Sequence, residues 1–157
     1  MEGESNIMSE TFGNISLLDR YRIGFLAGSK IAALSVLPTL DWASEIAARD
    51  DVSIISGFHS QLEQQVLEFL LRGRCGIIFV LARSLYSNIP AEYRSAFSDG
   101  RLLFVTEEKQ NRPTKDSAYR RNQLIISLCD ELVTPIISEE SSLHSLVTNN
   151  SKPITTL

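Results

Sequence analysis

Two arginines and an amide lie directly before an apolar run of the chain, where Arg120, Arg121 and Asn122 precede residues 124–128. Arginine suits phosphate because its planar guanidinium group can donate two parallel hydrogen bonds. A helix that begins at Tyr119 would place both guanidinium groups near backbone N–H groups that already favour an anion. The alternative is a solvated helix start, in which the arginines pair with neighbouring carboxylates (Glu107, Glu108 or Asp116). The sequence leaves both interpretations open.

Short apolar strands alternate with helical segments over most of the chain. We expect strands over residues 21–26, 52–55, 76–81, 102–105, 132–137 and 153–156. We expect helices over residues 38–49, 61–72, 91–99, 119–129 and 141–147. This alternation predicts an α/β, Rossmann-like doubly wound fold, with a mostly parallel sheet of about six strands and helices on both faces. Residues 1–18 are expected to form a flexible lead-in, and residues 19–157 a single domain.

The turns that follow the strands carry small residues and cations. Lys30 ends the turn after the first strand, Arg83 follows the third, and Arg112 lies in a long polar loop over residues 106–118. In sheets of this kind, ligands bind outside the carboxyl ends of the strands, near the point where the strand order reverses. The sequence therefore predicts that cations and small turn residues gather at one edge of the sheet.

Charge is unevenly distributed in this chain of 157 residues, whose formal net charge is −4. Residues 72–121 contain ten basic and five acidic side chains, so this segment carries +5 and the remainder −9. The net negative charge argues against a protein that coats nucleic acid indiscriminately, whereas the local excess favours one positive site on an acidic body. A hydrophobic content of 43% is typical of a globular protein.

No feature of the sequence indicates a membrane protein, a secreted protein or a metalloprotein. No apolar run approaches the roughly 20 residues that span a bilayer, and the amino terminus lacks the basic and apolar regions of a secretory signal. Cys75 and Cys129 lie far apart and form no metal-binding pair. We therefore expect reduced thiols in a cytoplasmic protein that makes no contact with a membrane.

Sequence motifs for catalysis are absent as well. The chain contains no glycine-rich dinucleotide motif, no phosphate-loop Gly-Lys-Ser/Thr and no Gly-x-Ser-x-Gly. His59 lies in a turn at the expected ligand edge, where a histidine can act as a general acid, contact phosphate or simply lie half-exposed. We assign no catalytic residue, no metal ligand and no cofactor, and we expect a non-enzymatic protein.

Five segments resemble motifs of the DNA-processing protein A (DprA/Smf) family. Residues 25–30 (FLAGSK) resemble its "VGSR" turn, and residues 54–57 (IISG) resemble its "VSGxAxGID" motif. Residues 77–81 (IIFVL), followed by an Ile-Pro pair, resemble "AVLxxGLDxxYP". Residues 119–125 (YRRNQLI) resemble "FxxRNRIIAGLS", and residues 141–143 (SSL) stand where "SGSL" is expected. The order and spacing of these segments hold over most of the chain.

This resemblance implies an extended Rossmann-like fold that binds single-stranded DNA in a basic pocket. It also implies a homodimer, and a recombinase partner during DNA uptake or recombination. The positions that match the family's pocket are Gly28, Ser29, Lys30, Ser56, Gly57, Arg121 and Asn122. Arg83 and Arg120 join this candidate site by their charge and position.

Two departures from the family pattern concern the turns of the candidate site. Phe58 follows Gly57 where the family has a glycine-rich turn. A bulky side chain there is expected to obstruct the close approach of phosphate to the backbone, which glycine permits. In the later motif, Ser142 stands where the family has glycine.

Four classes of function remain open on these residues. The first is a non-enzymatic protein that binds single-stranded DNA through phosphate contacts, made by backbone N–H groups and by arginine and lysine. The second is a sensor or carrier for a small nucleotide-like phosphate ligand, favoured by the compact size and the overall acidity. The third is an enzyme similar to the nucleoside monophosphate phosphoribohydrolases, although the glycine-rich turn and glutamate of those enzymes are missing. The fourth is an assembly module that has lost its ligand, suggested by Phe58.

Overall fold

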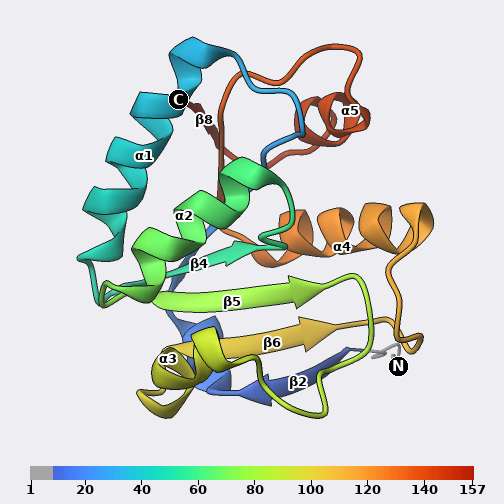
Figure 1. The fold of residues 1–157 in the computed structure, drawn as a ribbon. Coiled ribbons are helices and arrows are strands. Elements are labelled where there is room, and N and C mark those ends of the chain that lie inside the picture. Colours follow the sequence, from blue (N-terminus) through green and yellow to red (C-terminus); the bar gives the residue numbers. More distant parts are fainter. Residues whose placement is uncertain (1–8) are drawn as a thin grey trace.

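The computed structural model describes residues 9–157 of the chain (Figure 1). Its strands are β2 (Glu10–Gly13), β3 (Tyr21–Phe25), β4 (Val52–Ser56), β5 (Gly76–Leu81), β6 (Leu102–Thr106), β7 (Glu131–Thr134) and β8 (Ile154–Thr156). Its α-helices are α1 (Ala33–Ala47), α2 (Gln61–Leu71), α3 (Arg94–Ser98), α4 (Lys115–Leu128) and α5 (Ser142–Thr148). Two short 3-10 helices, η1 (Ile15–Asp19) and η2 (Ala91–Tyr93), precede β3 and α3.

The strands of the described region form one seven-stranded sheet in the order β2-β6-β5-β4-β3-β7-β8. Strand β2 runs antiparallel to β6, and the other neighbouring strands are parallel. The chain moves outward from β3 through β4 and β5 to β6, and α4 then returns it to β7 on the other side of β3. The strand order therefore reverses between β3 and β7. In a doubly wound sheet this reversal opens a crevice at the carboxyl ends of the strands.

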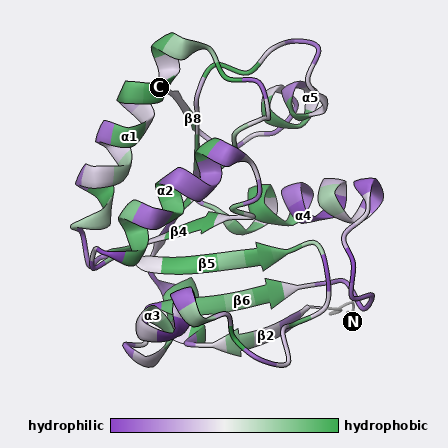
Figure 2. Ribbon diagram, viewed as in Figure 1, coloured by the Kyte–Doolittle hydropathy of each residue, from purple (hydrophilic) through white to green (hydrophobic). Residues whose placement is uncertain are grey.

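Helices cover both faces of the sheet, which confirms the fold class predicted from the sequence. On one face α1, α2 and α3 pack on a core that contains Phe25, Ile54 and Phe104. On the other face α4 and α5 pack on a core that contains Leu26 and Ile55. Successive residues of a strand point to opposite faces, so Ile54 and Ile55 enter different cores. Strands β4, β5 and β6 are buried along their whole length, and β5 and β6 are apolar over most of it (Figure 2), because both of their faces are covered.

Residues 10–18 adopt regular structure, contrary to the flexible lead-in expected from the sequence. Strand β2 pairs with β6 along its whole length. Leu17 is fully buried, and its carbonyl oxygen accepts a hydrogen bond of 2.8 Å from the Ser53 hydroxyl. All four residues of β2 are exposed, so they carry no apolar pattern from which the strand could be recognised. The rest of the expected lead-in, residues 1–8, lies outside the described residues.

Two helices begin earlier than the sequence pattern predicts. Helix α1 contains Pro38 in its interior rather than at its start. Helix α4 begins directly after Thr114, which forms a capping box with Ser117: the Ser117 N–H donates to Thr114 Oγ1 (3.0 Å), and the Thr114 N–H donates to Ser117 Oγ (2.8 Å). Arg120 and Arg121 therefore lie in the second turn of α4. The unpaired N–H groups of the helix start are not beside them, so the expected anion site at a helix start is wrong.

Candidate nucleic-acid interface

A cavity opens where the strand order reverses, between the turn after β3 and the loop after β7. Its volume is about 320 Å³, and its walls are Gly28, Ser29 and Lys30 on one side and residues of the loop 137–142 on the other. The backbone N–H groups of Gly28, Ser29 and Lys30 donate to no other residue in the described part of the chain. Glu140, on the loop side, lines the same cavity and brings one negative charge to it. The cavity is thus lined by a turn whose N–H groups have no partner in the described chain and which carries one ammonium group.

The turn after β4 is shaped by a buried aromatic ring. Phe58 has a φ of 45°, in the left-handed region that non-glycine residues rarely occupy. Its side chain is only 3% exposed and meets the Phe79 ring edge-on, with centroids 5.1 Å apart. The Phe58 N–H donates to the Ser56 hydroxyl (3.1 Å). The ring therefore enters the core and does not cover the turn, so the expected obstruction of the backbone by this side chain is wrong.

Glu63, in the first turn of α2, ties the β3 and β4 turns together. One carboxylate oxygen accepts the Ala27 N–H (2.9 Å), and the other accepts the N–H groups of His59 (2.8 Å) and Ser60 (3.1 Å). The carboxylate is buried, and three charge-assisted hydrogen bonds compensate its loss of hydration. The amides of His59 and Ser60 are consequently not available to a phosphate, unlike those of residues 28–30.

Arg121 crosses from α4 to the β4 turn and contacts Gly57. A Cβ atom built on Gly57 would lie 2.5 Å from Arg121 Nε and 2.6 Å from its Cδ, so only glycine leaves room for this side chain. The Arg121 Nε donates to Asn122 Oδ1 at 3.2 Å. Burial lowers the pKa of Arg121 below its ordinary value, and the Glu63 carboxylate opposes part of this effect.

The two terminal nitrogens of Arg121 have no partner among residues 9–157. Arg121 is 9% exposed, yet it forms no ion pair with any described carboxylate. Among fully buried side-chain nitrogen and oxygen atoms of the described region, only the Ser35 hydroxyl lacks a hydrogen bond. The terminal nitrogens of Arg121 therefore reach the surface, while the rest of its side chain is removed from water.

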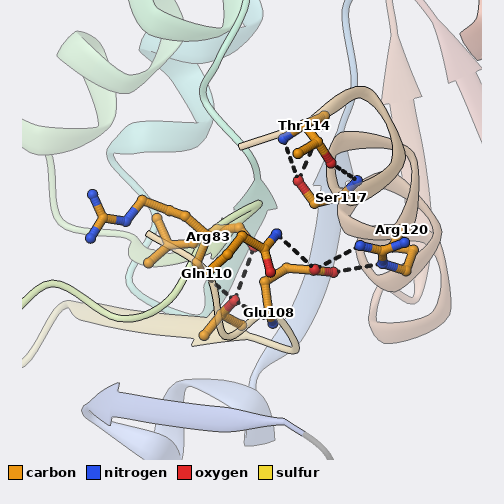
Figure 3. A network of polar contacts seen from close by, with 8 residues as sticks. Arg83, Glu108, Gln110, Thr114, Ser117 and Arg120 are labelled. Atoms are coloured by element: carbon orange, nitrogen blue, oxygen red, sulfur yellow. Dashed lines mark hydrogen bonds and ion pairs between the residues drawn. The ribbon is translucent and has the colours of Figure 1, made fainter. Parts of the chain in front are cut away.

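Arg120 forms an ion pair with a neighbouring carboxylate, which is the alternative that the sequence left open. Its Nε and one terminal nitrogen each donate to the Glu108 carboxylate at 2.8 Å (Figure 3). The hydrogen bond from Arg120 holds the pKa of Glu108 below its ordinary value, against the effect of burial. Gln110 adds a third hydrogen bond to the same carboxylate (3.1 Å). Arg120 therefore anchors the loop between β6 and α4.

Arg83 lies apart from both arginines of α4. Its Nε donates to the Ser84 carbonyl oxygen (2.9 Å), and its guanidinium carbon lies 4.6 Å from the centre of the Tyr86 ring. In Figure 3 its guanidinium group points away from the Glu108–Arg120 pair. Such stacking on an aromatic face is a common surface arrangement for arginine.

The structure brings most of the sequence-predicted site residues together in two adjacent clusters. Gly28, Ser29 and Lys30 line the cavity at the sheet reversal, and Gly57 contacts Arg121 beside Ser56 and Asn122. Glu63 joins the two clusters, since it binds the amides of Ala27 and of the β4 turn. Sequence reasoning missed Glu63, although Ser60 three residues before it is the signature of a capping box that the structure contains. Arg83 and Arg120 stand outside these clusters.

The remaining chemistry of the described residues is limited. Within residues 9–157 no three histidine, cysteine, aspartate or glutamate side chains gather in a way that could hold a metal ion. Cys75 and Cys129 are buried free thiols, and burial raises the pKa of Cys75 to about 11, which keeps it in its unreactive thiol form. Across the same part of the chain no helix combines the length and the apolar character needed to cross a membrane.

Two solved structures of DNA processing protein A have folds similar to this one. DNA processing protein A from Helicobacter pylori, which has a unique single-stranded DNA binding mode, superposes with a TM-score of 0.73 and 24% sequence identity, covering 94% of this chain and 70% of that one. DNA processing protein A (DprA) from Streptococcus pneumoniae superposes with a TM-score of 0.63 and 15% identity, covering 94% of this chain and 63% of that one. The sequence resemblance to DNA-processing protein A is therefore confirmed at the level of the fold.

A third solved structure has a more distant likeness. The Moco carrier protein of Chlamydomonas rheinhardtii superposes with a TM-score of 0.54 and 14% identity, covering 88% of this chain and 76% of that one. No protein-family model matches the sequence, and no curated protein matches it. At these identities the similarities establish the architecture and do not identify a ligand.

Proposed function

We propose that this protein binds single-stranded DNA and that Arg121 is the side chain that holds its phosphate. The observation that carries the proposal is a largely buried arginine side chain whose terminal nitrogens alone reach the surface and which forms no ion pair among the described residues. Burying an unpaired charge costs free energy, because the lost hydration is not replaced. Such costs concentrate at functional sites, where a ligand supplies the missing partner. An anion that meets the two exposed terminal nitrogens restores the lost interactions.

The surrounding residues have separate parts in this proposal. Asn122 accepts the Nε hydrogen, which leaves the two terminal nitrogens free to donate to a ligand. Gly57 leaves the space that the side chain occupies. Lys30 and the unused N–H groups of the turn 28–30 supply donors for a neighbouring phosphate, in the cavity at the sheet reversal. Recognition of this kind reads the phosphate backbone and carries no base sequence.

The shared fold supports a polymeric ligand over a free phosphate, because the Helicobacter pylori protein of the same architecture binds single-stranded DNA. A role in DNA uptake or recombination, a homodimer and a recombinase partner follow from the same resemblance and stay predictions. The chain spans 70% of one DNA processing protein A structure and 63% of the other. The proposal therefore concerns the binding of the strand alone.

Fluorescence anisotropy with a labelled oligothymidylate at low and moderate salt tests the proposal. Arg121→Ala should weaken binding roughly 10- to 100-fold, because a hydrogen bond to a charged group is worth about 1.5–3 kcal/mol. The control is Arg74→Ala, which removes the same charge from an exposed pair with Asp50 and should leave affinity within about twofold. Equal affinities for wild type and Arg121→Ala would refute the proposal.

The Moco carrier likeness favours a second candidate, a carrier of a small ligand. It uses the same cavity of about 320 Å³, which falls within the volume range of small-ligand sites, about 300–1,000 Å³. Thermal unfolding with mononucleotides and with oligothymidylate separates the two candidates, since a ligand that binds the folded state raises its stability. Stabilisation by a mononucleotide without any binding of the oligonucleotide would favour the carrier.

A further inference from the structure

A groove between α4 and α5 continues from the cavity at the sheet reversal. A second cavity of about 510 Å³ between these helices shares Ser142 with the first and contains Asn122, the neighbour of Arg121. A third, of about 230 Å³, shares Tyr119 and Leu146 with the second. We call this surface the α4–α5 groove and define it by Tyr119, Asn122, Gln123, Ser142, Leu146 and Asn149.

The walls of the groove suit a flat polar ring. Tyr119 is 45% exposed, and with Leu146 on the opposite helix it lines both cavities of the groove. The Tyr119 hydroxyl and the side-chain amides of Gln123 and Asn149 hydrogen-bond to no other residue in the described part of the chain. Amides can face both the donor and the acceptor groups of a base edge, and an aromatic ring can stack on any base.

The charge of the groove argues for a base rather than a phosphate. Lys115 and Asp116, the first two residues of α4, both line the second cavity, and their opposite charges offset each other. No other charged side chain contributes to the two cavities of the groove. The cationic groups of the candidate site, Arg121 and Lys30, lie instead toward the sheet reversal. A strand held there by its phosphates would lay its next bases along the groove.

We propose that the α4–α5 groove binds nucleobases of the strand whose phosphate is held at Arg121, with Tyr119 as the stacking platform. This inference rests on the proposed function and extends it, because it assigns the site to a strand of several nucleotides. It assigns affinity to bases as well as to phosphates. Stacking tolerates any base, and an amide can meet either a donor or an acceptor of a base edge, so the groove accepts different sequences.

Tyr119→Ala, measured by anisotropy with labelled oligothymidylate, tests the groove. The variant should bind about tenfold more weakly, since stacking of one base is worth about 1–3 kcal/mol, whereas Tyr119→Phe keeps the ring and should bind within about twofold of wild type. The matched control is Tyr21→Ala. Tyr21 is about as exposed, at 48%, but it begins β3 at the amino ends of the parallel strands, away from the candidate site at their carboxyl ends, so its loss should leave the affinity unchanged.

An oligonucleotide of the same length that lacks its bases separates base contacts from phosphate contacts. Wild type and Tyr119→Ala should bind this abasic strand equally, and both should bind it more weakly than wild type binds oligothymidylate. If Tyr119→Ala binds oligothymidylate as wild type does while Arg121→Ala does not, the groove is refuted and the phosphate site stands. If the wild-type protein binds no strand at all, the proposed function and the groove both fall.

Discussion

Replacing Gly57 by alanine adds a single methyl group at the point where the β4 turn meets Arg121. The new Cβ would lie 2.5 Å from Arg121 Nε, 2.6 Å from its Cδ and 3.0 Å from its Cζ. Carbon and nitrogen atoms pack without repulsion at about 3.5–4.0 Å, so the guanidinium group has to move by about 1 Å. Gly57 is not among the described glycines with positive φ, which are Gly13 and Gly100. Alanine therefore fits the backbone, and the strain is confined to the Arg121 side chain.

Gly57→Ala should change the free energy of unfolding less than it changes the free energy of DNA binding. Alanine in place of glycine stabilises a compatible backbone by about 0.4–1 kcal/mol, and overpacking costs about 1–3 kcal/mol when neighbours cannot yield. Because the colliding atoms belong to the end of a flexible side chain that reaches the surface, we expect a net loss of about 1 kcal/mol or less. A displaced guanidinium fork loses a charged hydrogen bond worth about 1.5–3 kcal/mol. Binding should therefore weaken roughly 10- to 100-fold.

Thermal unfolding and oligothymidylate anisotropy on the same Gly57→Ala preparation give both quantities. Gly73→Ala provides the contrasting variant, because its Cβ would lie only 2.3 Å from the carbonyl oxygen of Ala47, a backbone atom that cannot move aside. That variant should lose several degrees in Tm, while its folded fraction binds as wild type. Wild-type affinity in Gly57→Ala would show that the position of Arg121 does not matter to the ligand, and the reasoning would fail.

Substitutions at three further positions, two in the candidate site and one in the Glu108–Arg120 pair beside it, give separate predictions. Arg121→Met should lose binding while its Tm stays equal or rises, because an apolar side chain replaces an unpaired buried charge; a fall in Tm of many degrees would contradict this. Glu63→Gln should lower the Tm and weaken binding, since an amide oxygen can accept some but not all of the three N–H groups that now meet the carboxylate; Glu63→Asp tests whether charge alone rescues it. The lowered pKa of Glu108 contributes stability that is present above the ordinary glutamate pKa of about 4.3 and is lost as pH falls through the lower folded-state value. Arg120→Ala removes the main cause of the lowered Glu108 pKa, and burial then raises that pKa. The Tm of the variant should therefore fall less than that of wild type as pH decreases. An unchanged dependence of Tm on pH would show that the Glu108–Arg120 pair does not cause the acid destabilisation.

Much of the sheet could be predicted because its central strands are buried on both faces. A strand such as β5, with all six residues buried, appears in the sequence as an uninterrupted apolar run. Strand β2 gives no such signal, since it lies at the edge of the sheet with every residue exposed. The start of α4 gives a weak signal for a related reason: the polar residues 115–117 belong to the helix, and the Thr114–Ser117 capping box marks where it begins.

Two adjacent arginines of α4 have different surroundings, which the sequence alone did not distinguish. Arg120 and Arg121 are neighbours in sequence but point about 100° apart around α4, so one meets the loop carboxylate of Glu108 and the other meets the sheet. The periodicity contained a signal for this difference. Arg121 shares a helix face with Ser117 and Ile125, at spacings of four, and both are fully buried. Burial at those positions depends on how α4 packs on β4, which no local pattern in the sequence specifies.

In the proposed site, side chains rather than the backbone of the β4 turn would contact the phosphate. A glycine-rich turn would present its N–H groups to a phosphate, whereas here Glu63 accepts the amides of His59 and Ser60 and the Ser56 hydroxyl accepts that of Phe58. The same carboxylate lies near enough to Arg121 to favour its charged form. Glu63 thus removes backbone donors from the site and at the same time supports the guanidinium group that replaces them. In the proposed site, this exchange offsets the lack of any glycine directly after Gly57 in the β4 turn.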